Sequence, residues 1–150
     1  MSPGRIVAWM QRRLREQVPD LRHVGGAASF AEASESNPRV TPAAFVFSTA
    51  ESADGGGFSA DSPAMYRVEI AVVTVVRHVG DPSGADATDD IEALRDQEFA
   101  VLLGQRPDAQ HTEAQFLSGG ILAVRDRHYW WQDNWTLTTT LAADSVTDSL

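Results

Sequence analysis

The chain has 150 residues, a formal net charge of −9 at pH 7 and no cysteine. A chain of this length usually forms one domain around one hydrophobic core, so residues 1–150 are expected to be a single domain. The composition excludes disulfides and thiolate metal sites, the acidic charge argues against general nucleic-acid binding, and no run approaches the roughly 18–20 apolar residues of a membrane span.

The charge is distributed unevenly along the chain. Residues 1–23 hold five arginines against two acidic residues, and the rest of the chain is strongly acidic. All 12 basic residues are arginine. A GC-rich genome is the simpler explanation for that choice, and bidentate contacts at subunit interfaces are the alternative. Opposite charge on two parts of one chain also suits head-to-tail self-association.

A helix is predicted near the N-terminus, within residues 1–20. Apolar residues at helical spacing run from Val7 to Val18 before a proline stops the pattern. Arg5, Arg12 and Arg13 lie outside this apolar stripe. A solvated face is the simpler interpretation of these arginines, and contact with a partner is the alternative.

Between residues 21 and 63 the sequence predicts two short strands and two loops. The first strand is expected within residues 21–30 and the second over residues 43–50, separated by a polar connecting loop over residues 31–42. Residues 51–63 contain three consecutive glycines without the lysine of a phosphate loop. This loop is expected to be mobile in the free protein and to become ordered against a neighbour.

Residues 65–77 form the longest β-branched stretch without glycine or proline. Both sets of alternate positions are apolar in the middle, so a central strand covered on both faces is predicted. Arg67, Glu69 and Arg77 place charge near its ends. At ~3.3 Å per residue the strand is longer than a usual globular strand. Its ends are therefore expected to reach toward neighbouring subunits.

After a turn over residues 78–88, a second helix is predicted from Asp89 to Leu103. Asp89 and Glu92 have the spacing of an acidic cap, and Asp86 and Asp89 favour the positive end of a helix dipole. Binding of a divalent cation by these aspartates is the alternative, although the strict spacing of a calcium loop is absent. Gly104 provides a C-terminal stop.

The C-terminal part of the sequence predicts a long hairpin. Its first arm is expected over residues 121–131 and its second over residues 135–141, with the turn near residues 132–134. Arg125, Asp126 and Arg127 would then lie in the middle of a strand, which is typical of an exposed face or a subunit contact. Trp130 belongs to an aromatic cluster that is either core or an interface anchor. Residues 143–150 are expected to be a flexible tail.

Together these elements predict an α+β fold. It would have an antiparallel or mixed sheet of four to five strands, two helices packed on the sheet and a long C-terminal hairpin. The serines lack the sequence context of a nucleophile elbow, and the histidines share no metal-ligand spacing. We therefore expect no enzymatic activity, no metal site and no cofactor.

Five local features follow one another in a distinctive order. They are Pro-Ala-Ala-Phe-Val-Phe from Pro42, the glycine-rich loop with the long strand, Asp-Pro-Ser-Gly from Asp81, Leu-Leu-Gly-Gln-Arg-Pro from Leu102, and Phe-Leu-Ser-Gly-Gly-Ile-Leu from Phe116. In this order they resemble the tail terminator proteins of long-tailed bacteriophages, over roughly residues 42–141. They are packing and turn motifs, so the resemblance assigns no residue a chemical role.

The resemblance implies a structural virion protein without catalytic residues or a cofactor. It implies a ring, expected to be a homohexamer, that caps the finished tail tube, stops its polymerisation and provides the surface that joins tail to head. The implied partners are further copies of the chain, the tail tube protein and a head–tail connector or stopper protein, with no membrane and no sequence-specific nucleic acid. The implied location is the tail or neck of the virion, after assembly in the host cytoplasm.

Two other functions remain open at this point. One is another neck or head–tail completion protein, and the other is a small-molecule-binding or hydrolytic α+β domain.

For the subunit contacts we expect a basic surface, from the first helix or from Arg125 and Arg127, to pair with an acidic one. Reversing the charge of these two arginines is expected to weaken assembly and leave the fold intact. The candidate interface residues are Arg5, Arg12, Arg13, Arg67, Arg77, Arg125, Asp126, Arg127, Trp130, Glu51, Asp54, Asp61, Asp86 and Asp89.

Overall fold

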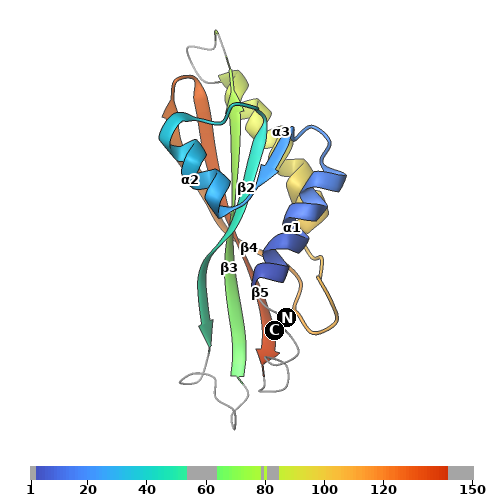
Figure 1. The fold of residues 1–150 in the computed structure, drawn as a ribbon. Helices are drawn as coiled ribbons and strands as arrows, with labels where there is room; N and C mark the ends of the chain where they lie inside the picture. The colour runs from blue at the N-terminus through green and yellow to red at the C-terminus, as the bar shows by residue number, and fades with distance from the viewer. Residues whose placement is uncertain (1–2, 54–63, 79, 81–84, 142–150) are drawn as a thin grey trace.

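The computed structural model describes residues 3–53, 64–78, 80 and 85–141, which form three helices and a five-stranded sheet. In chain order the elements are α1 (Pro3–Gln17), β1 (His23–Gly25), α2 (Ala27–Ser36), β2 (Ala43–Ala53), β3 (Ala64–Arg77), α3 (Ala85–Leu102), β4 (Gln115–Arg125) and β5 (His128–Leu141). The strand order is β1-β2-β3-β5-β4, parallel between β1 and β2 and antiparallel elsewhere. The predicted α+β class is confirmed, with one helix more than expected (Figure 1).

β3 is the central strand, and its middle is buried on both faces. Val68, Ile70 and Val72 belong to the core that α1 and α3 cover, whereas Val73 and Val75 belong to a second core under α2. Each of these five side chains is at most 1% exposed. The long strand predicted over residues 65–77 is therefore confirmed, and so is its burial on two sides.

α1 and α3 lie on the same face of the sheet. Ile6, Met10 and Leu14 of α1 share one core with Ile91 and Leu94 of α3. Full burial of one such side chain is worth roughly 1.5–3 kcal/mol, so this layer is a main source of stability. The predicted N-terminal helix is confirmed.

The structure corrects the prediction for residues 21–42. Only residues 23–25 form a strand, and α2 occupies most of the segment that we expected to be a strand end and a connecting loop. The sequence of α2 is rich in alanine, the best helix former, but Ala33 is its only buried residue among those described. Without an apolar stripe the helix gave no periodic signal. Phe30 attaches it to the sheet, with its ring 4.6 Å from that of Phe47 and 6.2 Å from that of Trp130.

The hairpin turn also differs from the prediction. The chain reverses at Asp126 and Arg127, whose φ angles of 50° and 61° suit a two-residue turn of type I′. Residues 132–134, which we expected at the turn, lie inside β5 and pair with residues 71–73 of β3. Arg125, Asp126 and Arg127 are therefore at the end of a hairpin and not in the middle of a strand.

α3 begins at Ala85, four residues before the predicted start. Asp89 and Glu92 are consequently inside the helix, so the acidic cap predicted from their spacing is wrong. Asp86 lies in the first turn, where its charge favours the helix dipole. Gly104, with a φ of 75°, ends the helix as predicted.

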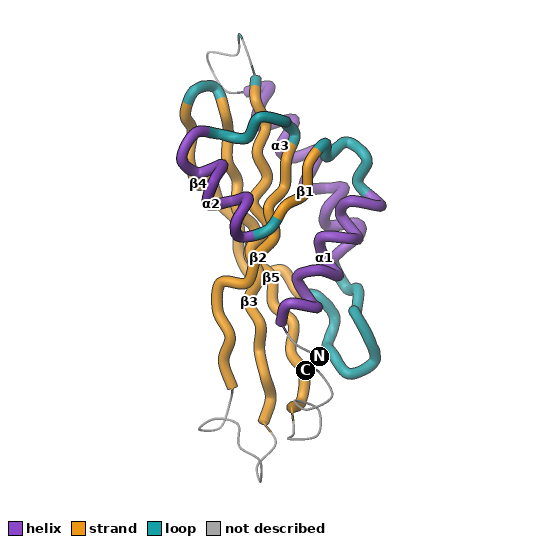
Figure 2. Tube along the Cα trace, in the orientation of Figure 1, coloured by secondary structure: helices purple, strands orange, loops and turns teal. Residues whose placement is uncertain are grey.

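Three strands extend beyond the helical layers. β2 continues to Ala53, three residues past its predicted end, and pairs with β3 along this extension. Figure 2 shows β2, β3 and β5 continuing together past the helices at one end of the molecule. We call this three-stranded part the distal end. The loop that we expected to be mobile lies largely in residues 54–63, outside the described residues, as does the predicted tail at residues 143–150.

A polar cluster joins α3 to the sheet. The Thr74 hydroxyl lies 2.8 Å from a carboxyl oxygen of Glu98, and Arg95 forms two hydrogen bonds of 2.9 Å with Asp133. The Trp131 indole also donates to Asp133, at 3.0 Å. Glu98 is 1% exposed, and burial raises its pKa to about 8, although the hydrogen bond with Thr74 opposes the shift. Glu98 therefore binds a proton at neutral pH.

Glu98 should make the stability of the fold depend on pH. Its pKa is 4.5 in an ordinary environment and about 8 in the fold, so between these values the folded chain holds a proton that the unfolded chain has lost. The contribution of this group to the free energy of unfolding should fall as pH rises through that range, by at most about 1.4 kcal/mol per pH unit, and level off above it. Urea unfolding at several pH values measures this slope.

Glu98→Gln stays neutral at every pH, so this variant should lose the part of the pH dependence of the free energy of unfolding that Glu98 causes. Glu92→Gln on the exposed side of the same helix is the matched control and should keep the wild-type pH dependence. The same pH dependence in wild type and Glu98→Gln would contradict the assignment.

Gly119 should be required by the same cluster. A Cβ atom at this position would overlap Asp133 Oδ1 and lie 3.2 Å from Trp131 Nε1, whereas a Cβ at Gly120 would meet nothing within 4 Å. Gly119→Ala should lower the free energy of unfolding by roughly 1–3 kcal/mol, as overpacking does, and Gly120→Ala should cost less. Chemical denaturation of the two variants makes the comparison, and equal losses would show that the cluster does not confine this position.

Candidate functional site

The described residues contain no group of three or more His, Asp or Glu placed to hold a metal ion. Within the same part of the chain, no helix combines the length and the apolar character needed to cross a membrane. The features that bear on function are on the surface of the molecule.

β4 is an open edge of the sheet. Among the described residues it pairs only with β5. The pairing shifts register at Leu117 and again at Leu122, and Gly119 and Gly120 lie between the two irregularities. Irregular pairing of this kind is typical of sheet edges, where it hinders uncontrolled strand addition.

The same edge strand carries a row of exposed apolar side chains. These large residues are more than one-third exposed and follow one another along one strand. They are Phe116 at 36%, Leu117 at 50%, Ile121 at 61%, Leu122 at 47% and Val124 at 53%. Phe116 also packs within the protomer, with its ring 5.0 Å from that of Phe99. Exposed apolar side chains on an open edge indicate a surface that associates with another protein.

The flank of α3 beside β4 is acidic. Arg95 and Phe99 of α3 reach over Trp131 and Phe116, so they mark the side of the helix that faces the β4 edge. Glu92 is one turn before Arg95, and Asp96 lies between Glu92 and Phe99 in the helical repeat. Both acidic side chains are exposed. We call Ile121, Leu122 and Val124, together with Glu92 and Asp96, the β4 side.

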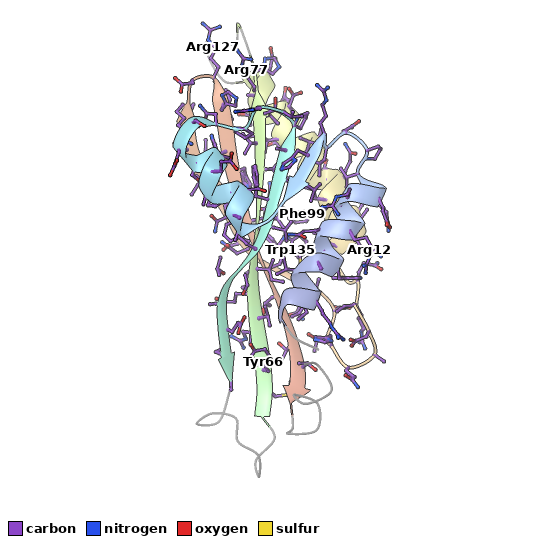
Figure 3. All side chains as sticks on the ribbon, viewed as in Figure 1. Arg12, Tyr66, Arg77, Phe99, Arg127 and Trp135 are labelled. Atoms are coloured by element: carbon purple, nitrogen blue, oxygen red, sulfur yellow. The ribbon has the colours of Figure 1, made fainter. Side chains whose placement is uncertain are left out.

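The flank of α1 beside β1 is basic. Gln11 and Arg15 face the β1 edge, because Arg15 donates to the Val24 carbonyl at 3.1 Å and Gln11 to the Gly25 carbonyl at 3.4 Å. Arg12 lies one turn before Arg15, and Figure 3 shows it on the outer side of α1. Arg5, Arg12, Arg15 and Arg22 are exposed, with Glu16 and Asp20 as acidic exceptions. We call these four arginines the α1 side.

The structure uses three of the predicted interface residues within the protomer. Arg13 donates to the Val101 carbonyl at 2.7 Å. The guanidinium of Arg125 bonds with Asn37 at 3.0 Å and with the carbonyl of Ala33 at 3.2 Å, at the C-terminal end of α2. Trp130, 2% exposed, lies in the core under α2. The expectation that Arg125 can be reversed without disturbing the fold is therefore at odds with its contacts.

Other predicted residues lie at the two ends of the molecule. Figure 3 shows Arg77 and Arg127 at the end opposite the distal end, and the His78 amide donates to the Arg127 carbonyl at 3.0 Å. Arg77 and Arg127 are exposed, so this end presents two arginines, with the exposed Asp126 beside them. Asp126 is in the same turn and accepts a hydrogen bond of 3.1 Å from Asn37.

The distal end presents mixed charge. Arg67 is exposed there, and Glu51 accepts a hydrogen bond from the hydroxyl of Tyr66. Burial and then the Glu51 carboxylate raise the pKa of Tyr66. Two of the predicted acidic residues, Asp54 and Asp61, lie outside the described residues.

Asp86 and Asp89 are exposed on α3. Asp89 lies one turn before Glu92, beside the acidic flank of the β4 side.

Sequence reasoning missed the apolar row of β4, because a run of apolar residues in a predicted hairpin normally indicates burial.

Comparison with known proteins agrees with a protein that works through contacts at its surface. A family model described as phage tail terminator protein matches residues 6–145, which include nearly all of the described elements. No curated protein matches the chain. The family supports a structural role in a bacteriophage tail, in contact with other tail components. The chain belongs to the phage tail terminator family.

Proposed function

We propose that the chain forms a ring, expected to be a homohexamer, on the end of the phage tail tube. The ring stops tube polymerisation and provides the surface that joins the tail to the head. The match of residues 6–145 to the terminator family carries this proposal. The open, apolar β4 edge supports it, because a protomer that works alone gains nothing from such a surface.

The shape of the protomer suggests how its surfaces are divided. A ring contact uses the sides of the protomer, and a cap on a tube uses its two ends. One end carries Arg77 and Arg127, and Tyr66 lies at the distal end (Figure 3). Glu51 and Arg67 belong to the same paired part of β2 and β3 as Tyr66. In this proposal the tail tube protein binds one of these ends and the head–tail connector or stopper protein binds the other, after assembly in the host cytoplasm.

The purified chain should form a closed oligomer and stop tube growth. Size-exclusion chromatography with light scattering should give the mass of a ring, alone or after addition of tail tubes. Electron microscopy of tubes grown from tube protein should show shorter tubes with capped ends when the chain is present. Tubes of unchanged length and uncapped ends would contradict the proposed function and favour another neck or completion role.

Arg125 and Arg127 should respond differently to charge reversal. Arg125→Glu removes two hydrogen bonds and a cation–π contact with Trp130, in which the guanidinium lies 4.9 Å from the ring centre. We expect it to lower the free energy of unfolding by roughly 1.5–3 kcal/mol, the range for hydrogen bonds to charged groups.

Arg127→Glu should leave the melting temperature nearly unchanged, because the side chain is exposed in the turn, and should weaken assembly on the tail. Thermal unfolding of both variants and tube capping by Arg127→Glu provide the measurements. Unaltered capping by Arg127→Glu would remove this arginine from the proposed assembly surface.

A further inference from the structure

We infer that the β4 side of one protomer binds the α1 side of a second copy of the chain, so that the subunits join head to tail. The inference rests on the proposed ring and assigns its lateral contact to particular residues. It differs from the charge pairing expected from the sequence, because an apolar edge strand supplies the centre of the contact. Three features of the described structure support it.

The first feature is the position of the two sides. β1 and β4 are the opposite edges of the sheet. The ladder runs from Val24 through Ala44, Thr74 and Trp131 to Ile121, so β1 and the middle of β4 lie in the same rows. Surfaces on opposite edges and at the same level can meet between successive copies without a shift along the strands. Such an arrangement closes into a ring when the rotation between copies allows it.

The second feature is that the helices beside the two edges belong to the same layer. α1 and α3 lie on the same face of the sheet. Head-to-tail contact between two copies therefore brings α1 of one copy next to α3 of the other while the β1 and β4 edges approach. A contact in the opposite sense, β4 to β4 about a two-fold axis, would pair two acidic flanks.

The third feature is charge. The α1 side presents Arg5 and Arg12, and the β4 side presents Glu92 and Asp96 around its apolar row. Arg95, the arginine on that flank of α3, is already paired with Asp133 and leaves the exposed charge negative. Opposite charge at the rim of an apolar contact sets the orientation of the partners and repels the wrong pairing.

The contact is expected to use side chains and not a continuous sheet. Arg15 donates a hydrogen bond to the Val24 carbonyl at the β1 edge, and Gln11 donates to the carbonyls of Gly25 and Val46. These contacts protect the edge against strand addition. The exposed side chains of Ile121, Leu122 and Val124 remain as the apolar centre.

Two blocked variants test this inference. Ile121→Arg blocks the β4 side and Arg5→Glu with Arg12→Glu blocks the α1 side, all at exposed positions. If Ile121→Arg fails to fold, Glu92→Arg with Asp96→Arg blocks the same side on an exposed helix flank. Met65→Arg, 41% exposed at the distal end, and Arg106→Glu, exposed in the loop after α3, are the matched controls. Circular dichroism checks the fold of each variant.

Light scattering after size-exclusion chromatography, with and without tail tubes, gives the readout. Each blocked variant alone should remain a monomer, and the two controls should assemble like wild type. An equimolar mixture of the two blocked variants should form a dimer and nothing larger, because each variant keeps one working side. This outcome distinguishes head-to-tail from two-fold contact, in which mixing creates no new complex.

Several outcomes would overturn the inference. One is wild-type assembly by the β4-blocked variant, and another is a mixture that stays monomeric. A third is a β4-blocked variant that forms rings but no longer binds tubes, which would assign the apolar row to the tube protein. Wild-type chain that is monomeric with and without tubes would also overturn it. Rings that assemble as inferred but leave tube growth unchanged would contradict the proposed function alone.

Discussion

Burial of β3 on both faces is the constraint on which the rest of the structure depends. Successive side chains of the strand, such as Val72 and Val73, enter two different cores, so the strand requires cover from two layers. α1 and α3 supply one layer and α2 supplies the other. α2 has only ten residues, so the second layer covers only part of its face of the sheet. At the distal end the strands extend beyond the helices on both faces (Figure 1).

Attachment of α3 to the sheet determines the character of the β4 side. Glu98 and Arg95 face the sheet, where a protonated carboxyl and an ion pair add to the apolar contacts of Ile91 and Leu94. A buried ion pair contributes little net stability but strongly disfavours any arrangement that leaves one charge unpaired. The cluster therefore fixes which flank of α3 overhangs β4, and that flank carries Glu92 and Asp96.

The sides and the ends of the protomer carry different groups. The sides carry the exposed apolar residues of β4 and charges of opposite sign, and the ends carry other charges, such as those of Arg77 and Arg127. In the proposed ring, the sides hold the subunits together while the ends remain available to other components of the tail. Neither contact requires chemistry at an atom, which is consistent with a family of structural tail proteins.

Local pattern in the sequence was sufficient for α1, the core of β2, all of β3 and the stop of α3 at Gly104, since each depends on neighbouring residues and on the period of a helix or strand. It was insufficient for α2, which has no apolar stripe, and for the turn at Asp126 and Arg127, which lacks the usual glycine. The candidate site shows the limit most clearly. The sequence left Arg125 on an exposed face or in a subunit contact and Trp130 as core or interface anchor, and in the structure α2 covers both. The exposure of the apolar row of β4 was not predicted, and it arises because the tertiary structure places β4 at the edge of the sheet. Strand order depends on pairing between distant residues, so only the folded chain decides which apolar residues are left for a partner.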